Sequence, residues 1–183
     1  MTASTYKWSV AKWHDLVKSG VLADKKVELL EGEIIEMSPE GIPRRNTNHR
    51  VVKYLRNLLD GLAEVYESHP ITLDNSEPEP DIAIVRLPES IYDSHHPYPE
   101  NIYWLVEISN ETLTKDLELK NITYSRNGII EYWVIDLKNN KLIVHTQPQN
   151  NNYAQIIEYR AGTVSPLAFP QEAIALEQLL LYQ

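Results

Sequence analysis

The sequence predicts an α/β or α+β fold in which helices flank a central mixed β-sheet. Segments with the apolar period of helices alternate with segments typical of strands. Some of these strands are almost continuously apolar, as expected for strands covered on both faces. The chain has 183 residues, 43% hydrophobic and 23% charged, which is enough to form a core. We therefore expect a single domain over residues 1–183.

The N-terminal part predicts a short helix followed by a hairpin. Ser9 is a good N-cap, and Gly20 stands where a helix end needs a positive φ. Short strands are expected at 27–30 and 34–37, because the segment between them, Glu31-Gly32-Glu33, is typical of a hairpin turn.

The clearest helix signal begins at Asn46 or Thr47 and ends at Val65. Its apolar stripe consists of Val51, Val52, Leu55, Leu58, Leu59, Leu62 and Val65. A short strand at 71–73 and a buried strand at 81–85 are expected next. Prolines and polar residues then predict a surface loop over 87–100.

The C-terminal half predicts further strands and two helices. In order, the expected elements are a strand at 103–108, a helix at 114–126, strands at 132–135, 142–144 and 155–159, and a helical stretch at 172–181. Gly128 is expected to end the first of these helices. Asn139-Asn140 is a two-residue turn signal and predicts a hairpin between the strands on either side of it.

Composition excludes several classes of function. The chain has 17 Lys+Arg and 26 Asp+Glu, a net charge of −9, so a nucleic-acid role would need a local basic patch. It has no Cys, which excludes disulfides, zinc–thiolate sites and cysteine nucleophiles. The N-terminus lacks a secretory signal pattern, and no run approaches the ~18 apolar residues of a membrane span. We expect no membrane association and a cytoplasmic location.

Two acidic residues stand at unusual places in the expected strands. Asp81 opens a buried strand, and Glu107 interrupts the most apolar one. A buried carboxylate is costly unless it is paired or bound to a cation. For Glu107, the alternative to a functional role is an ion pair with Arg or Lys inside the fold.

The helix expected at 114–126 has a lysine on its apolar side. At about 100° per residue, the four residues of this stripe fall within about 60° of one another. They are Leu113, Leu117, Lys120 and Tyr124. Lys115 projects beside Ile122, on the far side of the helix. If the stripe packs on the sheet, the Lys120 ammonium lies near Glu107; the alternative is a lysine that only covers the edge of the core.

Two carboxylates and one lysine at one locus suit metal-assisted phosphodiester hydrolysis. Mg²⁺ prefers oxygen ligands, lowers the pKa of its bound water and neutralises charge on the phosphate. A lysine can then stabilise the attacking water or a phosphate oxygen.

The segments around these residues resemble the Uma-type restriction endonuclease family of the PD-(D/E)XK nuclease superfamily. The matching segments are Glu-Pro-Glu-Pro-Asp81-Ile-Ala-Ile-Val, Trp-Leu-Val-Glu107-Ile-Ser109, Asp116-Leu-Glu-Leu-Lys120-Asn-Ile-Thr-Tyr124 and Gly128-Ile-Ile-Glu-Tyr132-Trp133-Val-Ile-Asp136. Upstream, Glu28-Leu-Leu-Glu-Gly32-Glu, Met37-Ser-Pro39 and His49 are also similar. The resemblance covers about 27–136, which would be the nuclease core.

The resemblance implies a restriction-endonuclease-like fold and a set of site residues. Asp81 would be the Asp of the first motif and Glu107 the acid of the second, both binding Mg²⁺ or Mn²⁺ together with the Ile108 carbonyl. The superfamily lysine normally follows that acid by two residues, where this chain has Ser109. Lys120 matches the family's helix lysine, and we prefer it over Lys115.

Further accessory residues follow from the same resemblance. Glu28 would be an accessory acid and His49 a residue at the edge of the active site, although the first could equally serve the hairpin and the second a helix cap. Ser109 and Tyr124 are the remaining accessory candidates.

A basic segment over 42–59 contains no Asp or Glu. Its basic residues are Arg44, Arg45, Arg50, Lys53 and Arg56. The first four are candidate DNA contacts, because a helix N-terminus also favours phosphate. The alternatives are a solvated helix face or ion pairs with the acidic hairpin.

The function expected from the sequence is a Mg²⁺- or Mn²⁺-dependent endonuclease that hydrolyses DNA. A homodimer is expected because cutting both strands in one encounter needs two active sites. The alternative is an inactive nuclease-fold module that binds DNA or a protein, and an enzyme for another phosphate ester is a third possibility.

Overall fold

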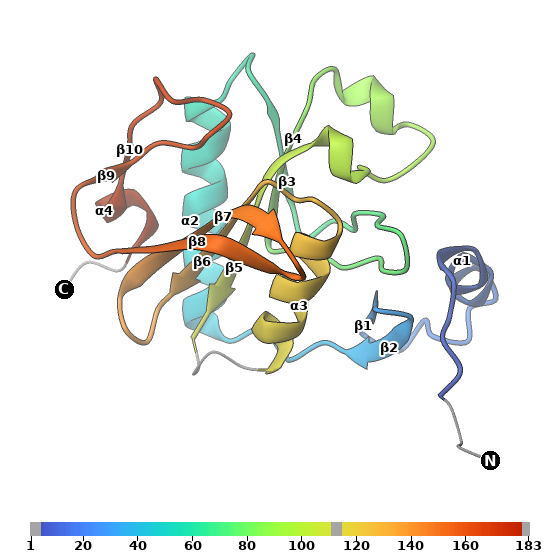
Figure 1. The fold of residues 1–183 in the computed structure, drawn as a ribbon. Helices are drawn as coiled ribbons and strands as arrows, with labels where there is room; N and C mark the ends of the chain where they lie inside the picture. The colour runs from blue at the N-terminus through green and yellow to red at the C-terminus, as the bar shows by residue number, and fades with distance from the viewer. Residues whose placement is uncertain (1–4, 111–114, 181–183) are drawn as a thin grey trace.

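A computed structural model describes residues 5–110 and 115–180, and within them the central feature is a six-stranded sheet of order β3-β4-β5-β6-β7-β8 (Figure 1). Its strands are β3 Glu64–Glu67, β4 Ile82–Val85, β5 Ile102–Ser109, β6 Glu131–Asp136, β7 Lys141–Gln149 and β8 Asn152–Tyr159. The β5 and β6 strands are parallel, and the other neighbours are antiparallel. The mixed α/β class predicted from the sequence is confirmed.

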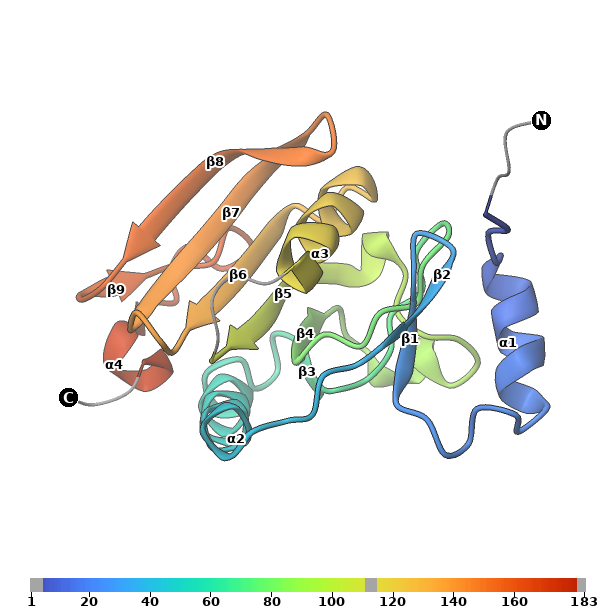
Figure 2. The same ribbon diagram turned by 90° about the horizontal axis from the view of Figure 1, so that it is seen from below.

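Helices cover both faces of this sheet (Figure 2). Along β5, Trp104 and Val106 belong to the core cluster that includes α2 (Ile42–Leu58) and α4 (Leu176–Leu179). Leu105 belongs to the cluster on the opposite face, which includes Tyr124 of α3 (Lys115–Arg126). Because side chains alternate along a strand, the odd-numbered residues of β4 and, from Leu105 onward, of β5 face α3; a register shift earlier in β5 places Ile102 on that face as well.

Smaller elements surround the sheet. They are α1 Val10–Lys18, β1 Val27–Leu30, β2 Glu33–Glu36, the short helices η1 Glu89–Tyr92 and η2 Pro99–Asn101, and the paired strands β9 Thr163–Val164 and β10 Ile174–Ala175. The β1–β2 turn needs Gly32 for two reasons. Its φ is +73°, and a Cβ atom there would lie 2.9 Å from the Lys7 Cβ.

Several sequence-based boundaries are confirmed. Ser9 caps α1 by accepting a hydrogen bond from the Lys12 N–H, and Gly20 has a φ of +75°. The hairpin of β1 and β2 is antiparallel as expected. The hairpin at Asn139-Asn140 is present as well, although β6 and β7 are joined by the four residues 137–140 and not by a two-residue turn.

Three predicted elements are wrong in whole or part. The helix expected to end at Val65 begins earlier, at Ile42, and ends at Leu58; Gly61 then adopts a φ of +72°, and Val65 lies in β3. Residues 71–73 form no strand, because their N–H groups bond to three separate carbonyls, those of Pro78, Pro97 and Ser76. In the stretch expected to be helical over 172–181, only α4 is helical within the described residues, after β10.

No helix among residues 5–110 and 115–180 combines the length and the apolar character that a membrane span requires.

Leu55→Ala is expected to lower the free energy of unfolding by about 2–5 kcal/mol, because it removes a fully buried side chain from the contact between α2 and the sheet. Lys53→Ala, two residues away on the exposed face of the same helix, is the control and should change stability by less than about 0.5 kcal/mol. Urea denaturation measures both. Equal stabilities of the two variants would contradict the assigned core.

His145 is expected to make stability depend on pH. It packs between the Tyr132 and Tyr153 rings, and burial lowers its pKa below 6.5 although its hydrogen bond to the Tyr132 carbonyl raises it. The unfolded chain therefore binds a proton more readily, so stability is lost as pH falls below about 6.5. In urea titrations from neutral to mildly acidic pH, wild type should lose more stability than His145→Gln; parallel losses would refute this role.

Candidate active site

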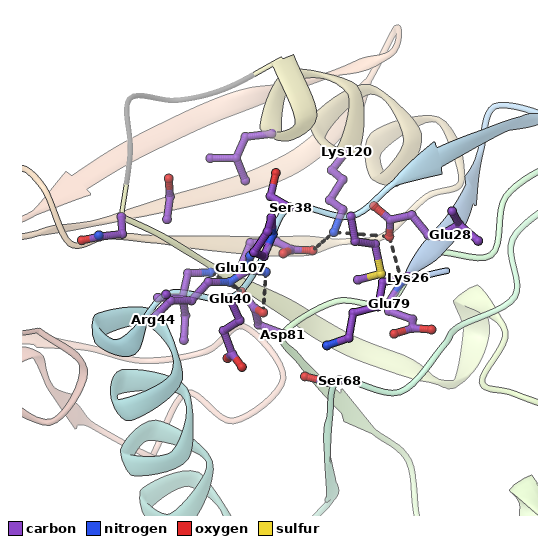
Figure 3. Close-up of a pocket in the computed structure, with 18 of the residues that line it drawn as sticks. Lys26, Glu28, Ser38, Glu40, Arg44, Ser68, Glu79, Asp81, Glu107 and Lys120 are labelled. Atoms are coloured by element: carbon purple, nitrogen blue, oxygen red, sulfur yellow. Dashed lines mark hydrogen bonds and ion pairs between the residues drawn. The ribbon is translucent and has the colours of Figure 1, made fainter. Parts of the chain in front are cut away.

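A cavity of about 520 Å³ opens where the β1–β2 hairpin, the start of α2, the start of α3 and the adjoining ends of β4 and β5 meet (Figure 3). Acidic and basic side chains of residues far apart in the sequence line it. The charged lining residues are Lys25, Lys26, Glu28, Glu40, Arg44, Glu79, Asp81, Glu107 and Lys120. Most of the predicted site residues thus share one cavity.

The sheet places the two predicted acids together. Ile82 of β4 pairs with Val106 of β5, so Asp81, just before β4, lies beside the end of β5 that includes Glu107. The Asp81 Oδ2 atom accepts a hydrogen bond of 2.7 Å from the Ile108 N–H. Asp81 is 5% exposed and Glu107 is 2% exposed, so both carboxylates are buried at the cavity floor.

Lys120 reaches these acids from α3. Its Nζ atom lies 2.9 Å from Glu107 Oε1 and 3.5 Å from Glu28 Oε2. Lys120 is 5% exposed, so it does not merely cover the edge of the core. Its direction agrees with the stripe predicted from the sequence, of which Leu113 lies outside the described residues. The internal ion pair considered for Glu107 is therefore present, and it lies inside the cavity.

Burial and neighbouring charges shift the ionisation of this cluster. Burial raises the pKa of the Glu107 carboxyl; the Lys120 ammonium opposes this shift, whereas Asp81 and Glu28 add to it. Burial alone would lower the pKa of Lys120, but the carboxylates of Glu107 and Glu28 more than offset it, so its pKa is raised and the ammonium stays charged. The cavity floor therefore holds a fixed positive charge next to a carboxyl group.

Arg44, at the start of α2, contacts the other acid. Its Nη2 atom donates to Asp81 Oδ1 at 2.7 Å, and its Nε atom donates to Oδ2 at 3.2 Å. Two such parallel hydrogen bonds form the bidentate geometry that suits a guanidinium and a carboxylate. Arg44, which the sequence suggested as a DNA contact, is thus an ion-pair partner of Asp81 in this structure.

The accessory candidates differ in position. Glu28 Oε2 accepts the Glu79 N–H at 3.0 Å, and the Tyr124 hydroxyl donates to Glu107 Oε1 at 2.9 Å. Ser109 lines the cavity. His49 is exposed on α2 and is not among the cavity residues. Lys115 begins α3, and its side chain is outside the described part of the chain.

The remaining basic residues of α2 serve different purposes. Arg50 donates to the carbonyls of Glu177, Gln178 and Leu179 and so connects α2 to α4. Arg56 donates to the Val65 carbonyl. Arg45 and Lys53 are exposed. Of the candidate DNA contacts, Arg44 is the one whose side chain lines the cavity.

Sequence reasoning missed Glu79 and Lys26 as cavity residues. The signal for Glu79 was available, because it stands two residues before Asp81 in an extended segment and so faces the same side. Burial and then the charge of Glu28 raise the pKa of Glu79. Lys26 lies just before β1, and only the fold brings it to the cavity.

The donor set suits a hard divalent cation. Mg²⁺ commonly takes one or two protein carboxylates and keeps several waters. Asp81, Glu107 and the Ile108 carbonyl could supply such oxygen ligands. Within residues 5–110 and 115–180, no group of three or more His, Cys, Asp or Glu side chains could hold a metal ion, so a cation here would depend on few protein ligands and on water.

Comparison with known proteins decides the family. The chain matches the Uma2 family, described as "Putative restriction endonuclease", over residues 13–177. The chain belongs to the Uma2 family. This confirms the resemblance found in the sequence and supports a nuclease-like function.

The fold of this Uma2 protein is shared with a solved structure. It is similar to the crystal structure of a "putative nuclease belonging to DUF820" from Anabaena variabilis ATCC 29413, with a TM-score of 0.66 and 17% identity over 84% of this chain and 88% of that one. A search of curated proteins found no match. The structural likeness concerns the fold, and the chemistry must be argued from the residues.

Proposed function

We propose that this Uma2 protein is a Mg²⁺- or Mn²⁺-dependent endonuclease that hydrolyses phosphodiester bonds in DNA. The observation that supports it most is the convergence of the buried carboxylates of Asp81, Glu107 and Glu28 and the buried Lys120 ammonium on a single cavity. A protein that only needed a stable core would gain little from such a cluster, because burying charges costs more than burying apolar side chains.

Each residue has a role that its position supports. Asp81, Glu107 and the Ile108 carbonyl would hold the cation, which lowers the pKa of a bound water and neutralises charge on the phosphate. Lys120, next to Glu107, orients the attacking water or stabilises a phosphate oxygen. Tyr124 donates to Glu107 and holds its carboxylate in place, which makes it a positioning residue.

Lys120 takes the place of the superfamily lysine in this proposal. In this chain the usual position of that lysine, two residues after Glu107, is occupied by Ser109, which lines the same cavity. The Lys120 ammonium lies 2.9 Å from Glu107 Oε1. A lysine on α3 can therefore reach Glu107, the same acid that a lysine at position 109 of β5 would serve. The site therefore has an ammonium group although the usual lysine position is occupied by Ser109.

Thermal unfolding with and without Mn²⁺ tests the metal site. A cation that binds the folded protein raises its unfolding midpoint, by an amount that grows with the cation concentration. We expect this increase for wild type and not for Asp81→Asn. If Mn²⁺ leaves the wild-type midpoint unchanged, the alternative of a nuclease-fold module that binds DNA or protein without cleavage is favoured.

A homodimer is part of the same proposal, because two active sites cut both strands in one encounter. Light scattering during size-exclusion chromatography measures the mass directly. A mass of twice the 21.1 kDa chain is expected, and a monomer at working concentration would argue against paired cutting.

A further inference from the structure

The ion pair between Arg44 and Asp81 places a cation on a carboxylate that the proposed function needs for a metal. Both Asp81 oxygens already accept hydrogen bonds, Oδ1 from Arg44 and Oδ2 from Arg44 and the Ile108 N–H. A dication on the same carboxylate would lie close to the guanidinium, and like charges repel strongly in a partly buried cavity. Arg44 and a divalent cation therefore compete for Asp81.

The two cations that pair with the buried acids of the cavity differ in accessibility. The Lys120 side chain is 7% exposed and lies between two acids, whereas the Arg44 side chain is 24% exposed. Arg44 can turn toward solvent without opening the core, since its backbone belongs to the first turn of α2 at the cavity mouth. Arg44 is thus the cation that can leave its carboxylate.

The start of α2 also favours an anion next to Arg44. This helix has 17 residues, its N-cap Gly41 provides no side-chain hydrogen bond, and its first turn contains no acidic residue. Positive side chains at a helix N-terminus repel the positive end of the helix dipole. A neighbouring anion stabilises both of these positive charges. Asp81 supplies that anion here, and a DNA phosphate in the cavity would supply it once Asp81 binds a metal.

We propose that Arg44 forms an ion pair with Asp81 in the metal-free protein. When a divalent cation displaces Arg44 from Asp81, the Arg44 guanidinium binds a DNA phosphate at the start of α2 instead. The inference rests on the proposed function and adds a coupling between metal and DNA binding. Asp81 is never left without a cation, and the phosphate-binding group becomes available only when the metal is in place.

Calorimetric titration with Mn²⁺ in the absence of DNA tests the competition. Arg44→Gln removes the competing charge and leaves the buried Asp81 carboxylate unpaired, so it should bind Mn²⁺ at least about tenfold more tightly than wild type. Arg45→Gln, a change of the same charge at the exposed neighbouring position, should bind Mn²⁺ as wild type does. Equal or weaker binding by Arg44→Gln would overturn the inference and leave the proposed function standing.

Absence of Mn²⁺ binding in wild type and in both variants would overturn the proposed function together with the inference. Unfolding midpoints in EDTA verify that the variants fold. If Arg44→Gln does not fold, Arg44→Lys is the second variant. Its single ammonium cannot make the bidentate contact, so it too should bind Mn²⁺ more tightly than wild type.

Binding of a labelled DNA duplex, measured by fluorescence anisotropy in EDTA and in Ca²⁺, tests the second half of the inference. Ca²⁺ should raise the affinity of wild type for DNA by at least about fivefold, and Arg44→Gln should lose most of this gain. Lys138→Gln, which removes the same charge at an exposed position outside the cavity, should keep it. If Arg44→Gln weakens DNA binding equally in EDTA and in Ca²⁺, Arg44 contacts DNA independently of the metal and the proposed exchange is wrong.

Discussion

Glu107→Gln is expected to lower the rate of metal-dependent DNA cleavage by at least about 10²-fold while leaving the fold intact. The substitution removes the charge of a proposed metal ligand and keeps its size and its ability to accept a hydrogen bond from Tyr124. Lys120 retains Glu28 as an acidic partner. Initial rates on supercoiled plasmid measure the loss, and circular dichroism checks the fold.

Glu40→Gln is the matched control for this variant. Glu40 lines the same cavity but is exposed at its mouth, and the substitution changes the net charge by the same amount. Its cleavage rate should stay close to that of wild type. If Glu107→Gln remained as active as this control, Glu107 would have no place in the reaction, and its ion pair with Lys120 would be purely structural.

Lys120→Met is expected to affect cleavage and stability together. The substitution leaves Glu107 and Glu28 without their buried cation, which should lower the free energy of unfolding by about 3–5 kcal/mol. If Lys120 also stabilises the attacking water or a phosphate oxygen, cleavage should fall by at least about 10²-fold at temperatures where the variant is folded. Urea denaturation and plasmid cleavage measure the two effects separately.

Two further variants separate the roles of Lys120. Lys26→Met removes an exposed lysine of the same cavity and should change stability by less than about 0.5 kcal/mol. In Glu107→Gln/Lys120→Met, the stability losses should be less than additive, because the two residues share one ion pair. Cleavage by folded Lys120→Met at the wild-type rate would transfer the role of the lysine to Lys115.

The mixed sheet could be predicted because its strands have local signals. The apolar run of β5 and the turn residues between β6 and β7 each identify their element without reference to the rest of the chain. Val65 could not be placed in this way. It continues the helical stripe of α2, and only its pairing with Ile84 in β4 makes it part of an edge strand.

The candidate site was predictable where it depends on strand and helix periodicity. Asp81 and Glu107 are conspicuous as charges in apolar strands, and the 3.6-residue period places Lys120 on the sheet-facing side of α3. The contact between Arg44 and Asp81 is different, since it joins the start of α2 to the start of β4 through tertiary packing. The sequence of a basic segment does not indicate which acidic residue each of its arginines pairs with in the folded protein.

Cleavage of supercoiled plasmid in Mg²⁺, Mn²⁺ and EDTA, by wild type and by Asp81→Asn, tests whether this Uma2 protein is a metal-dependent nuclease with Asp81 in its active site. We expect nicked and linear products for wild type in either metal, none in EDTA, and none for Asp81→Asn under any condition. Short labelled duplex and single-stranded DNA serve as further substrates. No cleavage of any of these substrates by folded wild type, or equal cleavage by Asp81→Asn, would contradict it.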